Sequence, residues 1–266
     1  MKMIPKSLIL LFTTSILIGS CTLLGAAGLT SQGQPTKTTP QQLTSTTANS
    51  VMNVDHAAWD KILKRYVDAN GDVDYKSLKD NREELQKYLK YVSSMQPNDD
   101  WSLQELLAFY INLYNAYTVD LIVENYPVKS IKDISGAWTK AIVPIGDRTL
   151  SLGGIENGVL RKMNEPRIHF AINCASISCP KLLNEAYTAG KINEQLDKAT
   201  REFINSEKNQ ISENSLKLSS IFDWYKGDYL INGNESVIDF INPFTDIKIS
   251  KNATIDYLDY NWNLNE

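Results

Sequence analysis

The chain has 266 residues, of which 42% are hydrophobic and 22% charged, and its formal net charge is −4. A chain of this length and composition can bury a sizeable core in one large domain or two small ones. The negative charge and the lack of a basic run argue against a nucleic-acid partner.

The N-terminal segment, residues 1–20, has the pattern of a bacterial signal peptide. Lys2 and Lys6 precede an apolar run that is shorter than the roughly 20 residues of a membrane-spanning helix. The residues Ile18-Gly-Ser-Cys21 resemble a lipobox, which implies cleavage before Cys21 and acylation of its thiol and new amino group. An ordinary signal peptide cut near Ala26 is the alternative. Two or more acyl chains would anchor the protein on a bacterial membrane, facing the periplasm or the cell exterior.

Residues 21–50 contain few large apolar side chains and many Ser, Thr and Gln residues. Such a segment cannot bury enough surface to offset the entropy lost on ordering it. We therefore expect an acylated Cys21 followed by a disordered, flexible tether. A single globular domain is expected over residues 51–266.

Helices and short hairpins are expected to alternate along the globular part. Apolar spacing predicts helices over residues 54–69, 78–95, 101–125, 152–163 and 191–205, hairpins over 141–151 and 211–218, and a strand at the start of 167–180. The helix over residues 101–125 is apolar nearly all round, which is typical of a helix buried in the middle of its domain. The pattern predicts the α+β class, with one helix-rich domain and a small β-sheet or hairpins around a buried central helix.

Two asparagines, Asn112 and Asn115, interrupt the central helix three positions apart, so they are neighbours on its surface. A buried amide without a partner costs roughly 1–3 kcal/mol. The two amides either pin an adjacent backbone segment, such as residues 174–180, or line a binding pocket, and the two roles are compatible.

No metal site and no cofactor are expected. Residues 68–74 imitate a calcium loop, but Val73 and Lys79 stand where the loop needs glycine and glutamate, so they indicate a plain turn. The chain has two histidines and two cysteines after Cys21, too few at workable spacing for a zinc site.

The stretch 167–180 holds His169, Cys174 and Cys179. A cysteine nucleophile needs a histidine base within hydrogen-bond reach. In a continuous strand, His169 and Cys174 would lie roughly 16 Å apart and on opposite faces. Cys179 could still reach His169, because the small residues between Cys174 and Pro180 let the loop fold back.

Two other interpretations of Cys174 and Cys179 stay open. An exported domain meets an oxidising environment, which favours a structural disulfide, and buried thiols are the reduced counterpart. So short a loop gains little stability from closure. A strained bond would be easy to reduce, which would make the pair a redox-active dithiol.

Several blocks of the chain resemble a known family, the domain of unknown function 547 (DUF547). They are Gly71–Tyr75, Ala108–Ala116, Tyr126–Ile131, Leu150–Leu152, Ile155–Arg161, Arg167–Ala171, Ser178–Pro180, Ser220–Tyr225 and Tyr257–Trp262. Together they span nearly all of residues 54–263. Some eukaryotic members are similar in carrying this domain beside glutaredoxin-like and DEP modules, which hints at redox or signalling roles.

The resemblance marks a pocket that includes Glu156, Arg161, His169 and the cysteines, which match the family pattern. It departs at Asn157, where the family usually has histidine. Asparagine cannot take up a proton near neutral pH, so this departure weakens the case for turnover.

Two functions follow as hypotheses. The first is a membrane-tethered domain that binds a peptide, glycan or small ligand, with Asn112, Asn115, Asn157 and Arg161 as candidate pocket residues. The second is a thiol-dependent hydrolase or acyltransferase of papain or transglutaminase type. In that enzyme Cys179 or Cys174 would be the nucleophile and His169 the base, with Glu156 or an asparagine of the central helix orienting the imidazole.

Overall fold

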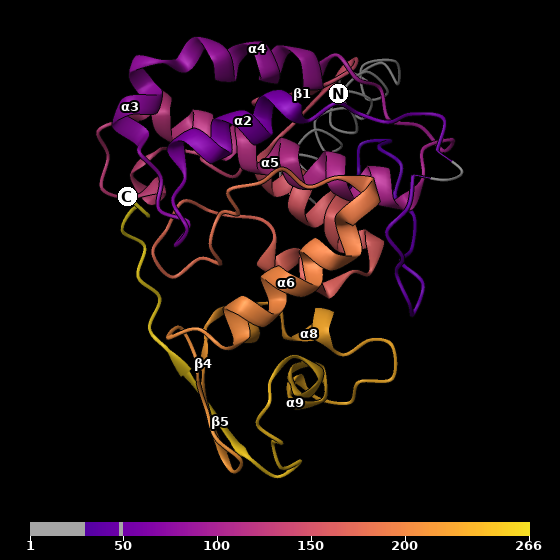
Figure 1. Cartoon of the computed structure of the whole chain (residues 1–266), viewed down its shortest axis with the longest axis vertical. Coiled ribbons are helices and arrows are strands. Elements are labelled where there is room, and N and C mark those ends of the chain that lie inside the picture. The colour runs from indigo at the N-terminus through magenta and orange to yellow at the C-terminus, as the bar shows by residue number, and fades with distance from the viewer. Residues whose placement is uncertain (1–29, 48–49) are drawn as a thin grey trace, which may run out of the picture.

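The computed structural model describes residues 30–47 and 50–266 and confirms the α+β class. The helices of the first half fill one end of the molecule, and a small sheet with short helices fills the other (Figure 1). In chain order the elements begin with α2 (Ala57–Tyr66), α3 (Tyr75–Asp80), α4 (Arg82–Ser93), α5 (Leu103–Asn125), η1 (Ile131–Asp133), β1 (Val143–Ile145), β2 (Arg148–Leu150), η2 (Gly154–Val159), η3 (Leu160–Met163) and η4 (Pro166–Phe170). There follow η5 (Ala189–Lys191), α6 (Ile192–Ile204), β3 (Gln210–Ile211), β4 (Ser215–Ser219), α7 (Ile221–Trp224), α8 (Lys226–Tyr229), α9 (Val237–Ile241), η6 (Asn242–Phe244) and β5 (Thr254–Leu258).

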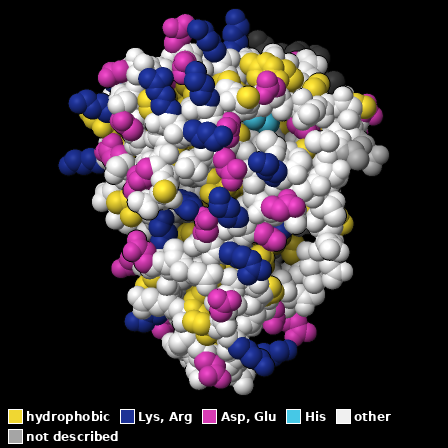
Figure 2. Space-filling model, viewed as in Figure 1, with side chains coloured by type: hydrophobic (Ala, Val, Ile, Leu, Met, Phe, Trp, Pro, Cys, Tyr) yellow, Lys and Arg dark blue, Asp and Glu magenta, His cyan; other side chains and the backbone are white. Residues whose placement is uncertain are grey.

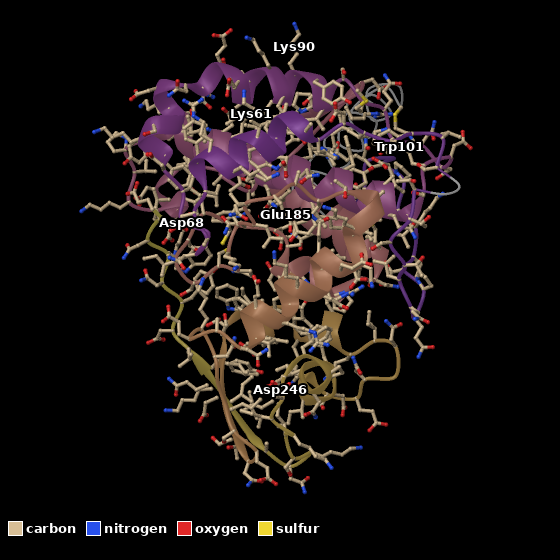
Figure 3. The ribbon with its side chains drawn as sticks, in the orientation of Figure 1. Lys61, Asp68, Lys90, Trp101, Glu185 and Asp246 are labelled. Carbon is tan, nitrogen blue, oxygen red and sulfur yellow. The ribbon has the colours of Figure 1, made fainter. Side chains whose placement is uncertain are left out.

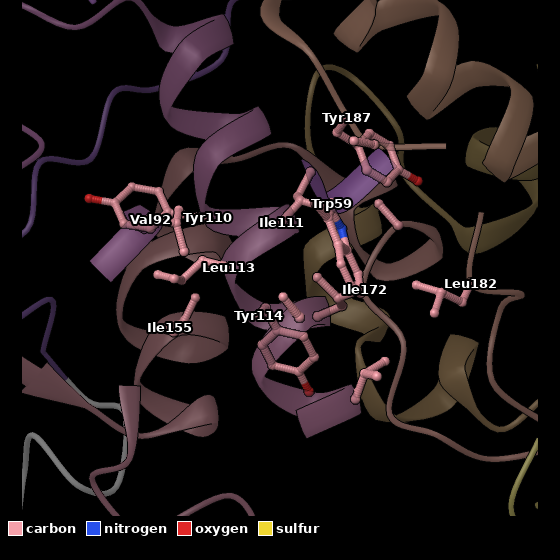
Figure 4. Close-up of a cluster of buried hydrophobic side chains, with 14 of the residues drawn as sticks. Trp59, Val92, Tyr110, Ile111, Leu113, Tyr114, Ile155, Ile172, Leu182 and Tyr187 are labelled. Carbon is pink, nitrogen blue, oxygen red and sulfur yellow. The ribbon is translucent and has the colours of Figure 1, made fainter. Parts of the chain in front are cut away.

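Helix α5 is the buried central helix that the sequence predicts. Its N-terminus is capped by Ser102, whose side chain accepts the Glu105 N–H at 3.1 Å. Side chains of α5 pack with residues that precede and follow it in sequence, from Trp59 to Tyr187 (Figure 4). Among the described residues, α5 is the one helix long and apolar enough to cross a membrane, but 89% of its most apolar window is buried in the protein. Burial on all sides explains why its apolar residues follow no single face.

Within the described part of the chain, buried apolar side chains form two clusters. The first surrounds α5, and the second contains Phe222, Tyr229 and Phe240 at the sheet end. Helix η4 lies where they meet, because its Ile168 belongs to the first cluster and its Phe170 to the second. The residue between them, His169, is therefore held at the junction.

The strand predicted at the start of residues 167–180 is wrong, because residues 166–170 form the 3-10 helix η4. Proline at the first helical position presets the backbone angle, and the Glu165 side chain accepts the Arg167 N–H at 3.2 Å as a cap. Ile168, His169 and Phe170 are all buried. Such a short apolar run does not by itself distinguish a strand from a helix.

Other predicted elements are confirmed or refined. The two hairpins form, with the pair Ile145↔Arg148 closing the turn of the first. The helix predicted over residues 78–95 lies within α3 and α4, which are separated at Asn81, and the one over 152–163 is a π-helix followed by a 3-10 helix. The turn after α2 is held by the Asp68 carboxylate, which accepts the backbone N–H groups of Asn70 and Asp72 at 2.8 and 2.9 Å.

The segment over residues 30–47 lies against the domain, although we expected it to belong to a flexible tether. Leu43 is only 4% exposed within the first cluster. The Thr39 N–H donates to Met163 O at 2.7 Å, and the Thr46 N–H donates to Ala189 O at 3.1 Å. One buried leucine and backbone hydrogen bonds hold this segment against the domain, although its polar composition predicts disorder. The predicted signal peptide and Cys21 lie outside the described residues.

The C-terminal residues connect the two ends of the molecule. Strand β5 pairs in parallel with β4, and the chain then returns to the helical end (Figure 1). On this path Ile177 N–H donates to Asn263 O at 2.9 Å, and Ser178 N–H donates to Asn261 O at 3.2 Å. Residues 261–263 therefore hold the cysteine loop from outside.

Charged side chains of both signs are interspersed over the face in Figure 2. Long basic side chains such as Lys90 project away from the helices into solvent (Figure 3). This mixed surface agrees with the small net charge of the chain.

Candidate functional site

A cavity of about 340 Å³ lies between the helical end and the sheet end. Its wall includes six aromatic side chains, which are Tyr114, Trp138, Trp224, Tyr225, Tyr260 and Trp262. Both cysteines of the described chain line it, and so do Glu156, Asn157 and His169. The structure therefore brings most of the predicted site residues into one cavity.

The aromatic wall is a packed group of rings. Trp224 and Trp262 stack with centroids 5.8 Å apart and planes at 18°, and Tyr260 lies 4.5 Å from Trp262. Trp138 meets Trp262 edge-on at 5.9 Å. Trp224 remains 48% exposed, so its ring offers a flat apolar surface at the edge of the cavity.

His169 is fixed on two sides. Its Nε2 atom lies 2.8 Å from Oδ2 of Asp228, and its ring stacks on Tyr225 with centroids 3.9 Å apart. An ionised carboxylate can only accept, so Nε2 carries the proton. The other ring nitrogen, Nδ1, is buried and has no hydrogen-bond partner among the described residues.

Asp228 is held by a second partner, Arg161, through a two-pronged pair at 2.6 and 2.8 Å. Burial opposes ionisation of Asp228, but the hydrogen bonds from Arg161 and His169 outweigh it and hold the pKa of Asp228 below its usual range. Arg161 also donates from Nη1 to Oδ1 of Asn157 at 2.8 Å. Arg161, Asp228 and His169 thus form a continuous polar chain beside the cavity.

Glu156 and Asn157 are supplied by the π-helix η2, whose wider turn sits next to α5 in the core. The Glu156 carboxylate accepts hydrogen bonds from the hydroxyl groups of Tyr225 and, at 3.4 Å, Tyr114. The Asn157 amide donates to Gly153 O at 3.1 Å and accepts from Arg161. Asn157 therefore acts here as a fixed polar link between Gly153 and Arg161.

The two cysteines are free thiols in direct contact, with their Sγ atoms 2.6 Å apart. The Cys174 N–H donates to Sγ of Cys179 at 2.9 Å. Asn173 shapes the loop, because its side chain donates to Pro180 O at 2.8 Å and accepts the Ala175 N–H at 2.7 Å. The loop thus closes on itself and brings the sulfurs together.

The surroundings of the two sulfurs differ. Burial raises the pKa of Cys179, but hydrogen bonds from Cys174 and Tyr260, and the nearby charge of Lys208, outweigh it and lower that pKa to about 7. The hydrogen bond with Cys179, and then burial, raise the pKa of Cys174 well above its usual value. The opposite directions of the two pKa shifts favour ionisation of Cys179 over that of Cys174.

Two hydroxyl groups lie beside the sulfur of Cys174, which is the less buried of the two cysteine residues. Sγ of Cys174 lies 3.3 Å from Oγ of Ser176 and 3.3 Å from the hydroxyl of Tyr260. Ser176 and Tyr260 are also hydrogen-bonded to each other at 3.0 Å. A thiol in this position has proton acceptors within reach.

His169 and the cysteines share the cavity without forming a pair. Among the residues that the structure describes, no hydrogen bond joins His169 to Cys174 or Cys179, and Nε2 of His169 is occupied by Asp228. The contact that a cysteine–histidine nucleophile requires is not formed in this arrangement.

Asn112 and Asn115 pin backbone segments rather than line the cavity. Asn112 donates to Tyr187 O at 2.7 Å and accepts Tyr187 N–H at 3.0 Å. Asn115 donates to Ala171 O at 2.9 Å and accepts Asn173 N–H at 2.8 Å. The second pair fixes the segment between η4 and the cysteine loop, so Asn115 positions the site from behind.

Sequence reasoning names neither Asp228 nor the aromatic residues at 224–225 and 260–262 among the candidate site residues. Asp228 lies 59 residues from His169, and no spacing rule connects positions so far apart. The close spacing of aromatic residues at 224–225 and 260–262 is visible in the sequence. It does not reveal that their side chains line a cavity.

Residues 98–204 match the family model described as "Protein of unknown function, DUF547". The matched range runs from just before α5 to the end of α6 and includes His169, both cysteines of the cavity and the Glu156–Arg161 segment. No curated protein and no solved structure matches the chain.

Proposed function

We propose that this chain, which carries a domain of the DUF547 family, binds a small ligand, or one end of a peptide or glycan, in the aromatic cavity. The observation that carries the proposal is a cavity of about 340 Å³ with six tryptophan and tyrosine rings on its wall. Binding sites for small molecules are concave, mostly apolar and of about 300–1,000 Å³.

The arrangement of the wall indicates what kind of ligand fits. The exposed face of Trp224 and the neighbouring Trp262 favour a planar ring or the apolar face of a sugar, because such groups gain contact area without losing hydrogen bonds. Glu156 and His169 bring polar atoms to the same cavity. These few polar groups would orient the ligand, while the rings supply most of the affinity.

The test uses the full-length protein in detergent and the neutral dye N-phenyl-1-naphthylamine as a reporter of cavity occupancy, followed by displacement of the dye with peptides and glycans. Replacing Trp224→Ala should weaken dye binding by about tenfold, since an aromatic contact of roughly 1.4 kcal/mol is lost. The matched control is Tyr91→Ala, which removes a ring that is 38% exposed on α4 and outside the cavity. Equal dye affinity in the two variants would exclude the cavity as the binding site.

We also propose that the domain is held on the extracytoplasmic side of a bacterial membrane through acylated Cys21. The support is the sequence pattern of Lys2, Lys6, the short apolar run and the lipobox. Metabolic labelling with an alkyne-bearing palmitate should mark the wild-type protein and not Cys21→Ser, which should leave the membrane fraction. An unmodified Cys21 inside the mature chain would rule this anchor out.

A further inference from the structure

We propose that Cys179 and Cys174 carry out thiol–disulfide exchange with a disulfide-bearing ligand that enters the aromatic cavity, with Cys179 as the attacking sulfur and Cys174 as the resolving one. The inference goes beyond ligand binding, and it requires only that the cavity admit a disulfide. It stands on three features of the loop. These are the contact between the two sulfurs, the backbone N–H that donates to the sulfur of Cys179, and the two hydroxyl groups beside the sulfur of Cys174.

The first feature is the contact itself. The sulfurs are 2.6 Å apart, which exceeds a disulfide bond by only about 0.5 Å. The Asn173 side chain holds both ends of the loop, at Ala175 and Pro180. Oxidation to a Cys174–Cys179 disulfide and reduction back to two thiols therefore require little movement of the backbone.

The second feature distinguishes the two sulfurs. Sγ of Cys179 accepts a backbone N–H from Cys174 at 2.9 Å, which favours its charged form. The ammonium group of Lys208 donates to the carbonyl oxygen of Cys179 and adds positive charge at the same residue. These contacts agree with the lowered pKa of Cys179, and the thiolate is the attacking species in exchange.

The third feature concerns the resolving thiol. Sγ of Cys174 lies 3.3 Å from the Ser176 and Tyr260 hydroxyl groups, so two oxygen atoms are placed to accept its proton. Tyr260 also belongs to the wall of the cavity. A ligand in the cavity would thus lie next to both cysteines and to Tyr260.

The reaction has two steps. The Cys179 thiolate attacks one sulfur of R–S–S–R′, the Cys179–S–R bond forms, and R′–S⁻ leaves and takes up the proton given up by Cys174. The sulfur of Cys174 then attacks Sγ of Cys179, the protein disulfide forms, and R–S⁻ leaves and is protonated by water. The ligand disulfide gains two electrons and the protein dithiol loses them, and a second dithiol restores the protein by the reverse steps.

The experiment uses the full-length chain carrying Cys21→Ser, in which Cys174 and Cys179 are the remaining thiols. The probe is 4,4′-dithiodipyridine, a neutral aromatic disulfide whose released thiopyridone absorbs light. The chain with both cysteines should release about two equivalents of thiopyridone and retain no adduct by mass spectrometry, because the second thiol resolves the first adduct. Retention of two adducts, or no reaction in the native protein, would overturn the proposal.

Single variants assign the two roles. Cys174→Ser should react and keep one adduct, at a rate about tenfold above that of Cys179→Ser near pH 7, and the two rates should become similar in urea. A faster reaction of Cys179→Ser in the native state would overturn the assignment of the attacking sulfur. Binding of N-phenyl-1-naphthylamine is measured on the same samples, so failure of exchange with intact dye binding is distinguishable from failure of the binding function.

Discussion

The Nε2 atom of His169 lies 2.8 Å from Oδ2 of Asp228, and the same oxygen accepts the Nε–H of Arg161 at 2.6 Å. One carboxylate therefore ties together η4, α8 and η3, which come from separate parts of the chain. Because His169 stands between the two hydrophobic clusters, this carboxylate fixes the junction on which the cavity depends.

Replacing Asp228→Asn should lower the free energy of unfolding by roughly 1–3 kcal/mol, since charge-assisted hydrogen bonds to Arg161 and His169 are lost. Urea unfolding followed by circular dichroism measures the change. The control is Asp223→Asn, an exposed carboxylate on α7, which should shift stability by less than about 0.5 kcal/mol. The pKa of Asp228 is lowered in the folded protein, so its contribution is present near neutral pH and fades below about pH 4. Equal effects of the two substitutions would contradict a structural role for the carboxylate.

Acid should destabilise the protein through His56, which is 4% exposed and whose Nδ1 atom lies 2.7 Å from the Tyr88 hydroxyl. Burial lowers the pKa of His56 to about 4, against a smaller raising effect of Asp55. The unfolded chain binds a proton below about pH 6.5 and the folded chain resists it, so stability should fall by about 2 kcal/mol between about pH 7 and pH 5. Urea unfolding midpoints measured between pH 7 and pH 5 give the dependence of stability on pH.

The variant His56→Asn supplies the comparison, because an amide nitrogen can stand near the Nδ1 position without titrating. Its stability should change less with pH over the same window. An unchanged slope in the variant would assign the acid sensitivity to other groups.

The Asn115 amide should contribute to both stability and site geometry. In Asn115→Asp, a carboxylate oxygen replaces the amide nitrogen that donates to Ala171 O, so a buried carbonyl loses its donor and faces another acceptor. We expect a loss of roughly 2–4 kcal/mol, together with weaker dye binding in the cavity. Asn125→Asp also removes a donor, from Leu121 O at 2.8 Å, but at the exposed end of the same helix, so stability should fall by less than about 1 kcal/mol and dye binding should stay unchanged.

Gly71 should tolerate no side chain, for two separable reasons. Its φ is +88°, and a Cβ there would lie 2.4 Å from Cβ of Lys181 and 2.9 Å from the backbone of Leu182. Gly233 has the same φ of +88° but nothing within 4 Å. Gly233→Ala should therefore cost about 1 kcal/mol through backbone strain alone, and Gly71→Ala should cost about 2–3 kcal/mol more through the clash. Thermal unfolding of the two variants gives the difference in stability. Similar losses of stability in both would show that Lys181 and Leu182 can move to accommodate the added methyl group.

The helical part of the fold could be predicted from residue patterns because its signals are local. The continuous apolar character of residues 103–125 and the cap at Ser102 both lie within one segment. The Asn112 and Asn115 amides were recognisable as groups that need partners, but Tyr187 and Ala171 could not be named in advance. Those partners are 75 and 56 residues away.

The cavity was harder to predict because its geometry depends on contacts between distant segments. A strand at the start of residues 167–180 would have put His169 far from Cys174, whereas the 3-10 helix shortens the path and places both in one cavity. Asp228 gives no sequence signal of its own, since a single aspartate after a lysine and a glycine is common in any chain. The proximity of Cys174 and Cys179 could be predicted from their spacing. The hydrogen-bond donors that give the two thiols different pKa values could not.

The walls of the cavity come from both hydrophobic clusters, with Ile172 from the one and Ile221 from the other. Loss of either half of the molecule would destroy the pocket, so any occupant is lost when the chain melts. A ligand at a hundred times its dissociation constant should add about 2.7 kcal/mol to the stability of the folded state. Melting-temperature screening of metabolite and cell-wall extracts can therefore find the natural occupant before any reaction is known.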